Sequence, residues 1–204
     1  RKSKKKGTNR MKNELKKNDF SVSLEIFPPK KEEEFAGAFE LLDKLALLNP
    51  DFISVTYGAG GSRSKKTVEM TSYIKNTLHI PALAHLTCVG NTKKDIDTVV
   101  ADLKAAGINN VLALRGDRPS YMTDEQYNAR EFEHASDMIA YLKETTDFKI
   151  AGACYPEKHF EAFSFKEDVR YLKQKVDLGV EMLISQLFFD NEMFYRFEEM
   201  TQIA

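Results

Sequence analysis

Side chains with reactive groups occur where six short apolar runs of the sequence end. They are Glu25, Thr56, His85, Arg115 with Asp117, Tyr155, and Gln186. Parallel strands bring their carboxyl ends to one edge of a sheet, and barrel enzymes collect their chemical groups there. The spacing therefore predicts one shared site, built from residues that lie far apart along the chain.

Glu25 is the first candidate for proton chemistry. It lies between Leu24 and Ile26, and Phe27 follows before two prolines end the run. A carboxylate in such apolar surroundings is poorly solvated, which favours its neutral form and predicts a proton donor near neutral pH. A buried structural glutamate paired with a lysine would give the same local sequence, so both interpretations stay open.

The segment 112–119 places Arg115 and Asp117 directly after an apolar run. It predicts a charged cluster at the mouth of the fold. An Arg–Asp pair that only braces the loop 117–130 is the alternative. This loop, which contains Tyr121 and Tyr127, is longer than a strand-to-helix connection requires and is a candidate ligand lid.

Further along the chain, Asp168, Tyr171 and Lys175 recur at helical spacing, so one helix face can present an acid, an aromatic ring and a cation. A solvated helix surface would look similar. Gln186 precedes Phe188 and Phe189, a set suited to a flat heterocycle. Glycines in the segment 57–63 permit an anion to approach a helix N-terminus, although a tight turn alone also needs glycine.

The remaining candidates indicate structural roles. A lone histidine in a strand, such as His85, is more often a hydrogen-bonded structural residue than a catalyst. Histidine or carboxylate partners at metal-ligand spacing do not accompany it, so we expect no metal site. Cys88 and Cys154 lie far apart and are expected to be small core residues in a reducing cytoplasm.

These residues need an alternating α/β scaffold. The apolar runs predict strands at 22–27, 52–56, 82–87, 110–114, 149–154 and 182–188, and amphipathic patterns predict helices near 32–48, 64–78, 92–106, 131–146, 164–178 and 191–204. The turn after the first strand reads Phe27-Pro28-Pro29-Lys30-Lys31 and lacks the glycines of a dinucleotide-binding turn. We therefore expect a (β/α)8 TIM barrel of which six βα units are present, with two more units beyond residue 204 closing the sheet.

Composition sets the domain organisation. The 204 residues, 42% of them hydrophobic and 30% charged, suit one globular domain, here 20–204. The net charge of −1 conceals nine Lys or Arg and one Glu in residues 1–17, which leaves 21 basic and 30 acidic side chains in the rest. Without aromatic residues or an amphipathic period, residues 1–19 are expected to be a disordered basic extension that binds neither nucleic acid nor membrane.

Six segments in register resemble the methylenetetrahydrofolate reductase family from about residue 20 to residue 204. They are Leu24-Glu25-Ile26-Phe27-Pro28-Pro29, Ser54-Val55-Thr56-Tyr57-Gly58-Ala59, Ala84-His85-Leu86-Thr87-Cys88, Leu114-Arg115-Gly116-Asp117, Tyr155-Pro156-Glu157-Lys158-His159 and Gln186-Leu187-Phe188-Phe189-Asp190. The resemblance implies an eight-fold barrel that binds FAD and passes hydride from NADH or NADPH to methylenetetrahydrofolate by a ping-pong mechanism. It also implies a cytoplasmic homo-oligomer.

The resemblance implies roles for individual residues. Glu25 and Asp117 would be catalytic, Glu25 as the acid that protonates folate N10, and both would contact substrate together with Gln186. The cofactor would be bound by Thr56, Ala59, His85, Arg115, Gly116, Asp117, Ala135, Tyr155, His159, Ala162, Asp168, Tyr171 and Lys175. Many bacterial members have an Asn and an Arg where this chain has Tyr171 and Gln174.

Two other functions fit parts of the sequence. Another FAD-binding barrel oxidoreductase, similar to proline dehydrogenase, would share the cofactor site and oxidise a different substrate. A catalytically inactive truncated barrel with a basic arm would act as a binding module and take up no FAD. The choice between NADH and NADPH stays open, because the sequence contains no dinucleotide-binding fingerprint.

Overall fold

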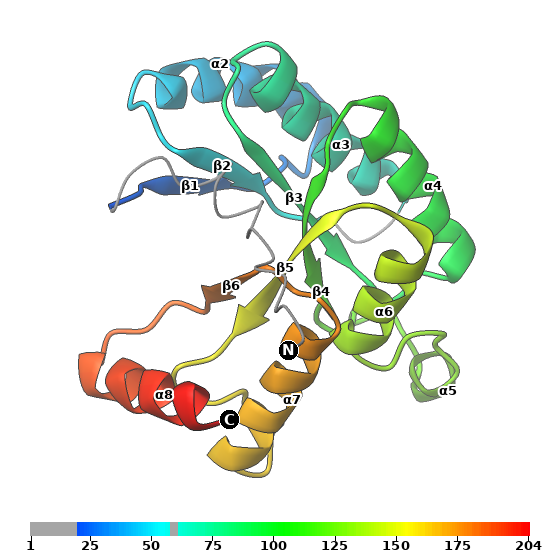
Figure 1. Cartoon of the computed structure of the whole chain (residues 1–204). Helices are drawn as coiled ribbons and strands as arrows, with labels where there is room; N and C mark the ends of the chain where they lie inside the picture. Colours follow the sequence, from blue (N-terminus) through cyan, green and yellow to red (C-terminus); the bar gives the residue numbers. More distant parts are fainter. Residues whose placement is uncertain (1–19, 58–60) are drawn as a thin grey trace, which may run out of the picture.

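The computed structural model describes residues 20–57 and 61–204, with only the backbone for residues 61–63. Six strands alternate with helices (Figure 1). The strands are β1 Ser23–Ile26, β2 Phe52–Val55, β3 Ala82–Thr87, β4 Asn110–Leu114, β5 Lys149–Cys154 and β6 Met182–Ser185. The helices are η1 Glu32–Glu34, α2 Phe35–Ala46, α3 Gly61–Asn76, α4 Lys93–Ala105, α5 Asp124–Asn128, α6 Ala135–Thr145, α7 Phe165–Asp177 and α8 Asn191–Ile203.

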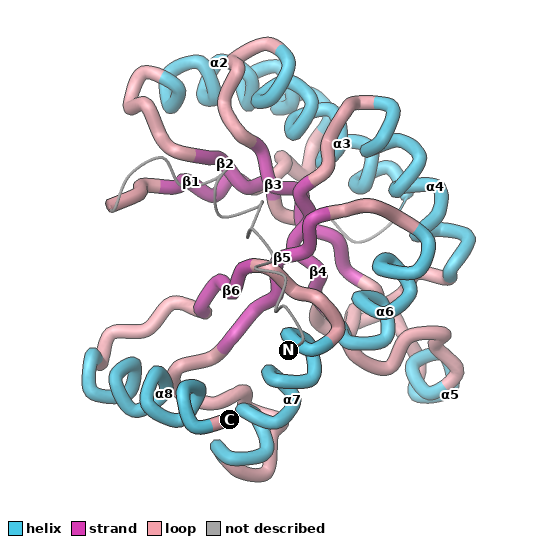
Figure 2. Tube along the Cα trace, viewed as in Figure 1, coloured by secondary structure: helices cyan, strands magenta, loops and turns pink. Residues whose placement is uncertain are grey.

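The six strands form one all-parallel sheet in the order β1-β2-β3-β4-β5-β6. The sheet curls, so that the edge strands β1 and β6 lie on the same side of the molecule and the helices cover its outer face (Figures 1 and 2). Right-handed crossovers through helices produce this arrangement when each new strand pairs with the preceding one. The expectation of a TIM-barrel-like α/β fold is confirmed.

The two faces of the sheet pack differently. Side chains such as Val55, Leu86 and Val111 point outward and join the helices in the main core. The inward face carries a smaller cluster, built by Phe52, Leu83, Leu112 and Ala151. Because both faces are apolar over much of β2 to β5, these strands appear in the sequence as continuous apolar runs.

The element boundaries differ from the predicted ones where local chemistry intervenes. β1 ends at Ile26, two residues before Pro28, and β6 ends at Ser185 instead of extending to residue 188. The helix expected from residue 131 begins at Ala135, since the Asp137 carboxylate accepts hydrogen bonds from the backbone N–H groups of Glu133 and His134. Asp137 thus supplies an acceptor for backbone N–H groups that have no partner within the helix, and the helix starts after them.

The short helix α5 in the loop 117–130 was not predicted. Thr123 caps it by accepting a hydrogen bond from the Gln126 backbone, and the Gln126 side chain accepts one from Thr123 N at 3.0 Å. This reciprocal capping box is readable from the Thr-x-x-Gln spacing. Arg118 further braces the loop through Asp124 and the Met122 carbonyl. None of the described helices is long and apolar enough to span a membrane.

Candidate functional site

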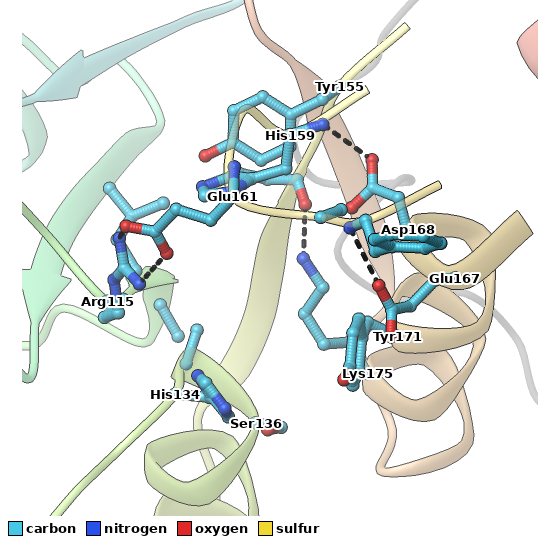
Figure 3. A pocket seen from close by; sticks show the side chains of 16 residues that line it. Arg115, His134, Ser136, Tyr155, His159, Glu161, Glu167, Asp168, Tyr171 and Lys175 are labelled. Carbon is cyan, nitrogen blue, oxygen red and sulfur yellow. Dashed lines mark hydrogen bonds and ion pairs between the residues drawn. The ribbon is translucent and has the colours of Figure 1, made fainter. Parts of the chain in front are cut away.

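A cavity of about 360 Å³ lies at the carboxyl ends of β4 and β5, between the N-terminus of α6 and the face of α7 (Figure 3). Its walls come from the two strand ends, the β5–α7 loop and the two helices. Eight of the residues predicted for the cofactor line it together: Arg115, Ala135, Tyr155, His159, Ala162, Asp168, Tyr171 and Lys175. The structure therefore brings together residues that are up to 60 positions apart in the chain.

The β5–α7 loop, residues 155–164, is held against the start of α7 by two carboxylates. Asp168 accepts a hydrogen bond from His159 N at 2.9 Å, and Glu167 accepts one from Phe163 N at 2.8 Å. Ser164 caps the helix by accepting from Glu167 N at 3.2 Å. Charge-assisted bonds to backbone N–H groups are among the stronger hydrogen bonds of a protein, so this wall of the cavity is well fixed.

Lys175 places a partly buried cation in the cavity. Its ammonium donates a hydrogen bond to the Ala153 carbonyl at 2.6 Å. Burial lowers the pKa of Lys175, while nearby Asp168 opposes that change. The carbonyl acceptor carries no full charge and Asp168 compensates only part of the ammonium charge, so Lys175 is the group on this side that could pair with an anion.

Aromatic rings and a neutral imidazole form the upper wall in Figure 3. The rings of Tyr155 and His159 meet edge to face with centroids 4.7 Å apart. Burial lowers the pKa of His159, and burial raises the pKa of Tyr155, so both are neutral near pH 7. The Glu161 backbone N–H donates to His159 Nδ1 at 3.2 Å, which leaves the ring proton on Nε2.

Several lining residues were missed by the sequence interpretation. His134 and Ser136 flank Ala135 at the start of α6, and Glu161, Phe163 and Glu167 lie in or after the β5–α7 loop. Arg115 forms a two-pronged ion pair with Glu161, and not with Asp117 as the loop-bracing alternative supposed. The two partners are 46 residues apart, and no sequence spacing links them.

A second group of candidates lies on the inner face of β1 to β3. Glu25 Oε2 is 3.4 Å from His85 Nε2 and 3.5 Å from the Ser54 hydroxyl, which donates to it. Burial lowers the pKa of His85 to about 4, so the imidazole is neutral at pH 7. Its Nε2 is buried, and although close to Glu25 it has no hydrogen-bond partner within the described residues.

The prediction that Glu25 is poorly solvated is wrong for this structure. Its side chain is 48% exposed, although Ile26 beside it is buried. Leu24 and Ile26 point to the helices, whereas Glu25 points to the opposite face of an edge strand, because successive side chains alternate. Its apolar sequence neighbours therefore do not surround it.

The other predicted residues lie around these two groups. Thr56 follows β2, and its carbonyl accepts from the Thr67 hydroxyl at 3.0 Å. Gly116 has φ +83°, and a Cβ there would lie 2.8 Å from Val89 Cγ1. Asp117 and Gln186 are exposed after β4 and β6. Ala59 lies outside the described residues.

Cys88 and Cys154 are free and buried, as expected for core residues, and burial raises the pKa of Cys88 to about 12 and that of Cys154 to about 11. Neither thiol is poised for nucleophilic chemistry. Within residues 20–57 and 61–204, no three His, Cys, Asp or Glu side chains form a group that could hold a metal ion.

A curled parallel sheet with outer helices and a cavity at its strand ends defines an α/β protein of the TIM-barrel class. A solved structure of a monomeric dihydrodipicolinate synthase variant is similar to this chain with a TM-score of 0.52 and 18% identity, over 91% of this chain and 60% of that one. At that identity the similarity concerns the fold alone.

The family is shown by sequence. The methylenetetrahydrofolate reductase family model matches residues 10–204, and the chain belongs to this family. It is 38% identical over 179 residues to 5,10-methylenetetrahydrofolate reductase of Escherichia coli K12, covering 88% of this chain and 58% of that protein. It is 37% identical over 186 residues to a probable methylenetetrahydrofolate reductase (NADH) of Oryza sativa subsp. japonica, covering 86% of this chain and 31% of that protein. The chain thus spans less than two thirds of the length of these relatives.

Proposed function

We propose that this chain forms the flavin-binding part of a methylenetetrahydrofolate reductase. The reaction would reduce 5,10-methylenetetrahydrofolate to 5-methyltetrahydrofolate, with NADH or NADPH as the donor and FAD as the bound cofactor. Family membership supports the reaction. The cavity that gathers eight of the predicted cofactor residues at one edge of the sheet is the observation that carries the proposal.

The lining of the cavity has the chemical character that a flavin nucleotide requires. It combines a partly buried cation at Lys175 with aromatic rings, a pattern suited to a ligand that joins an anionic group to a flat heterocycle. On the inner face of the sheet, the buried Nε2 of His85 still needs a partner. These features fit the cofactor.

The residues of the chain would divide the work. Lys175 would hold the diphosphate, while Tyr155 and His159 would pack against the nucleotide. Bound FAD would supply hydride transfer between the two substrates.

Glu25, which is open to solvent at the strand end, would deliver a proton to folate N10, and Gln186 would contact the nicotinamide and the pterin in turn. Use of one face by both substrates would give a ping-pong order. Asp117 would border the flavin and the folate.

The proposal extends to the setting of the enzyme. Two free, buried cysteines suit a reducing compartment such as the cytoplasm. We also propose a homo-oligomer with small-molecule substrates, which analytical ultracentrifugation of the purified protein would test.

FAD content and half-reactions test the function. The purified protein should be yellow, bleach anaerobically with NADH or NADPH, and regain its colour with methylenetetrahydrofolate. Comparison of the two bleaching rates identifies the donor. A colourless protein that takes up no added FAD would sink the proposal. Recovery of colour with pyrroline-5-carboxylate, but not with methylenetetrahydrofolate, would instead favour a proline dehydrogenase-like enzyme.

A further inference from the structure

Glu161 and Arg115 form an ion pair at one side of the cavity (Figure 3). Arg115 follows β4, and Glu161 lies in the β5–α7 loop. Both Nη atoms of the guanidinium donate to the carboxylate, Nη2 to Oε1 at 3.0 Å and Nη1 to Oε2. A planar carboxylate that accepts two parallel bonds fixes the orientation of a guanidinium as no single bond can.

The pair connects two neighbouring βα units. The other two carboxylates of the cavity, Glu167 and Asp168, bond to backbone N–H groups of the adjoining loop, within the same βα unit. Glu161 instead reaches from that loop to the end of β4. It therefore sets where the loop stands relative to Arg115, and with it the width of the cavity on this side.

The pair also leaves Arg115 with a limited set of donors. A guanidinium has five N–H groups. Two bond to Glu161, and Nε–H points to the Gly116 carbonyl at 3.4 Å, so two remain available within the described surroundings. Since Glu161 cancels the charge of Arg115, those N–H groups would serve an uncharged acceptor better than a second anion.

On the opposite side of the cavity, the positive charge of Lys175 is not paired in the way that the charge of Arg115 is paired with Glu161. Lys175 donates its hydrogen bond to a neutral backbone carbonyl, whereas Asp168, which acts on Lys175 through its charge, accepts its hydrogen bond from His159 N. An anionic group would gain more beside Lys175 than beside the neutralised Arg115. The cavity is thus electrically asymmetric from β4 to α7.

We propose that Glu161 is a positioning residue that orients Arg115 and cancels its charge, so that Arg115 binds an uncharged carbonyl of the ligand ring and leaves the anionic group to Lys175. The inference rests on the proposed function for the identity of the ring as a flavin. Its electrostatic part can be measured without flavin.

The experiment compares Glu161→Gln and Glu161→Asp with the wild-type full chain. Glu199→Gln is the matched control, because Glu199 is exposed on α8 and loses the same charge far from the cavity. Inorganic phosphate binding is measured by calorimetry without FAD. The reduction potential of bound FAD is then measured for each protein, and thermal unfolding verifies that each one is folded.

In Glu161→Gln the uncompensated guanidinium should bind phosphate at least about tenfold more tightly than wild type, the equivalent of one charge-assisted hydrogen bond. The potential of bound FAD should shift upward, since reduction adds negative charge near a free cation. Glu199→Gln should behave as wild type in both measurements, and Glu161→Asp, which keeps the charge, should stay closer to wild type than Glu161→Gln does. Unchanged phosphate affinity and potential in a folded Glu161→Gln protein would overturn the inference, whereas a wild-type protein that binds no FAD would refute only the proposed function.

Discussion

His85 Nε2 and Glu25 Oε2 lie 3.4 Å apart, and they form a contact between a buried neutral imidazole and a half-exposed carboxylate. The contact bridges β3 and β1 over Ser54 on β2. Burial lowers the pKa of His85 although the Glu25 carboxylate lies beside it, because that carboxylate is half exposed to solvent, which screens its charge. The imidazole therefore stays uncharged near pH 7 beside a carboxylate that is open to solvent.

Glu25→Gln should separate the two half-reactions. The amide keeps the size of the side chain but cannot deliver a proton, so folate reduction should fall by at least about a hundredfold, in the range of general acid catalysis. Bleaching by the nicotinamide should stay near the wild-type rate, as stopped-flow absorbance would measure. Glu40→Gln, at an exposed position of α2, is the control. Normal folate turnover in Glu25→Gln would remove Glu25 from this role.

His85 should make stability depend on pH. Its folded pKa of about 4 lies below the ordinary value of 6.5, so the unfolded chain takes up a proton first as the pH falls. The contribution is fully present above pH 6.5 and is lost between pH 6.5 and 4, by up to about 3 kcal/mol. Urea unfolding across this range should show a shallower pH dependence for His85→Asn than for wild type.

His79→Asn is the control for that measurement, because His79 is exposed and its φ of +57° suits asparagine. Its pH profile should follow the wild-type profile. Equal slopes for His85→Asn and wild type would show that burial of His85 does not set the acid sensitivity.

Gly116→Ala should destabilise the end of β4. The alanine would adopt φ +83° and place its Cβ 2.8 Å from Val89 Cγ1 and 3.0 Å from Thr87 Cβ. Strain and contact together should lower the free energy of unfolding by about 1–3 kcal/mol. Gly37→Ala on α2 meets nothing within 4 Å and should raise it by about 0.5–1 kcal/mol. Denaturant unfolding of both variants would show whether the free energy of unfolding falls in Gly116→Ala and rises in Gly37→Ala.

Asp168→Asn should loosen the β5–α7 loop. The amide oxygen can still accept from His159 N, but the bond loses its charge assistance, at a cost of about 1 kcal/mol. FAD binding should weaken together with stability, because the loop carries Tyr155 and His159. Asp177→Asn, at the exposed end of α7, should leave FAD affinity as it is. A loss of stability without any loss of FAD affinity would argue against a role of the loop in binding.

The strands and most helices could be predicted because each depends on its own residues. β3 to β5 match their apolar runs, and α4 begins where Thr92 and Asp95 form a capping box. The parallel order follows from the alternation of elements, which also explains why Arg115 and Tyr155 meet.

The errors arose where a property depends on neighbours across the sheet. The exposure of Glu25 is decided by the face of an edge strand, which its flanking residues do not reveal. Glu161 escaped notice because its partner Arg115 belongs to another βα unit. The α5 helix was missed although its capping residues were present, because a five-residue helix has too short an apolar pattern.

The consecutive strand order has a consequence for how the cavity is encoded. Every residue that lines it falls between Ala113 and Lys175, within two successive units, one from β4 to α6 and one from β5 to α7. One continuous segment of the sequence therefore encodes the whole cavity. A chimaera that exchanges residues 110–177 with a relative would transfer the whole wall intact, with both junctions placed at the ends of regular elements.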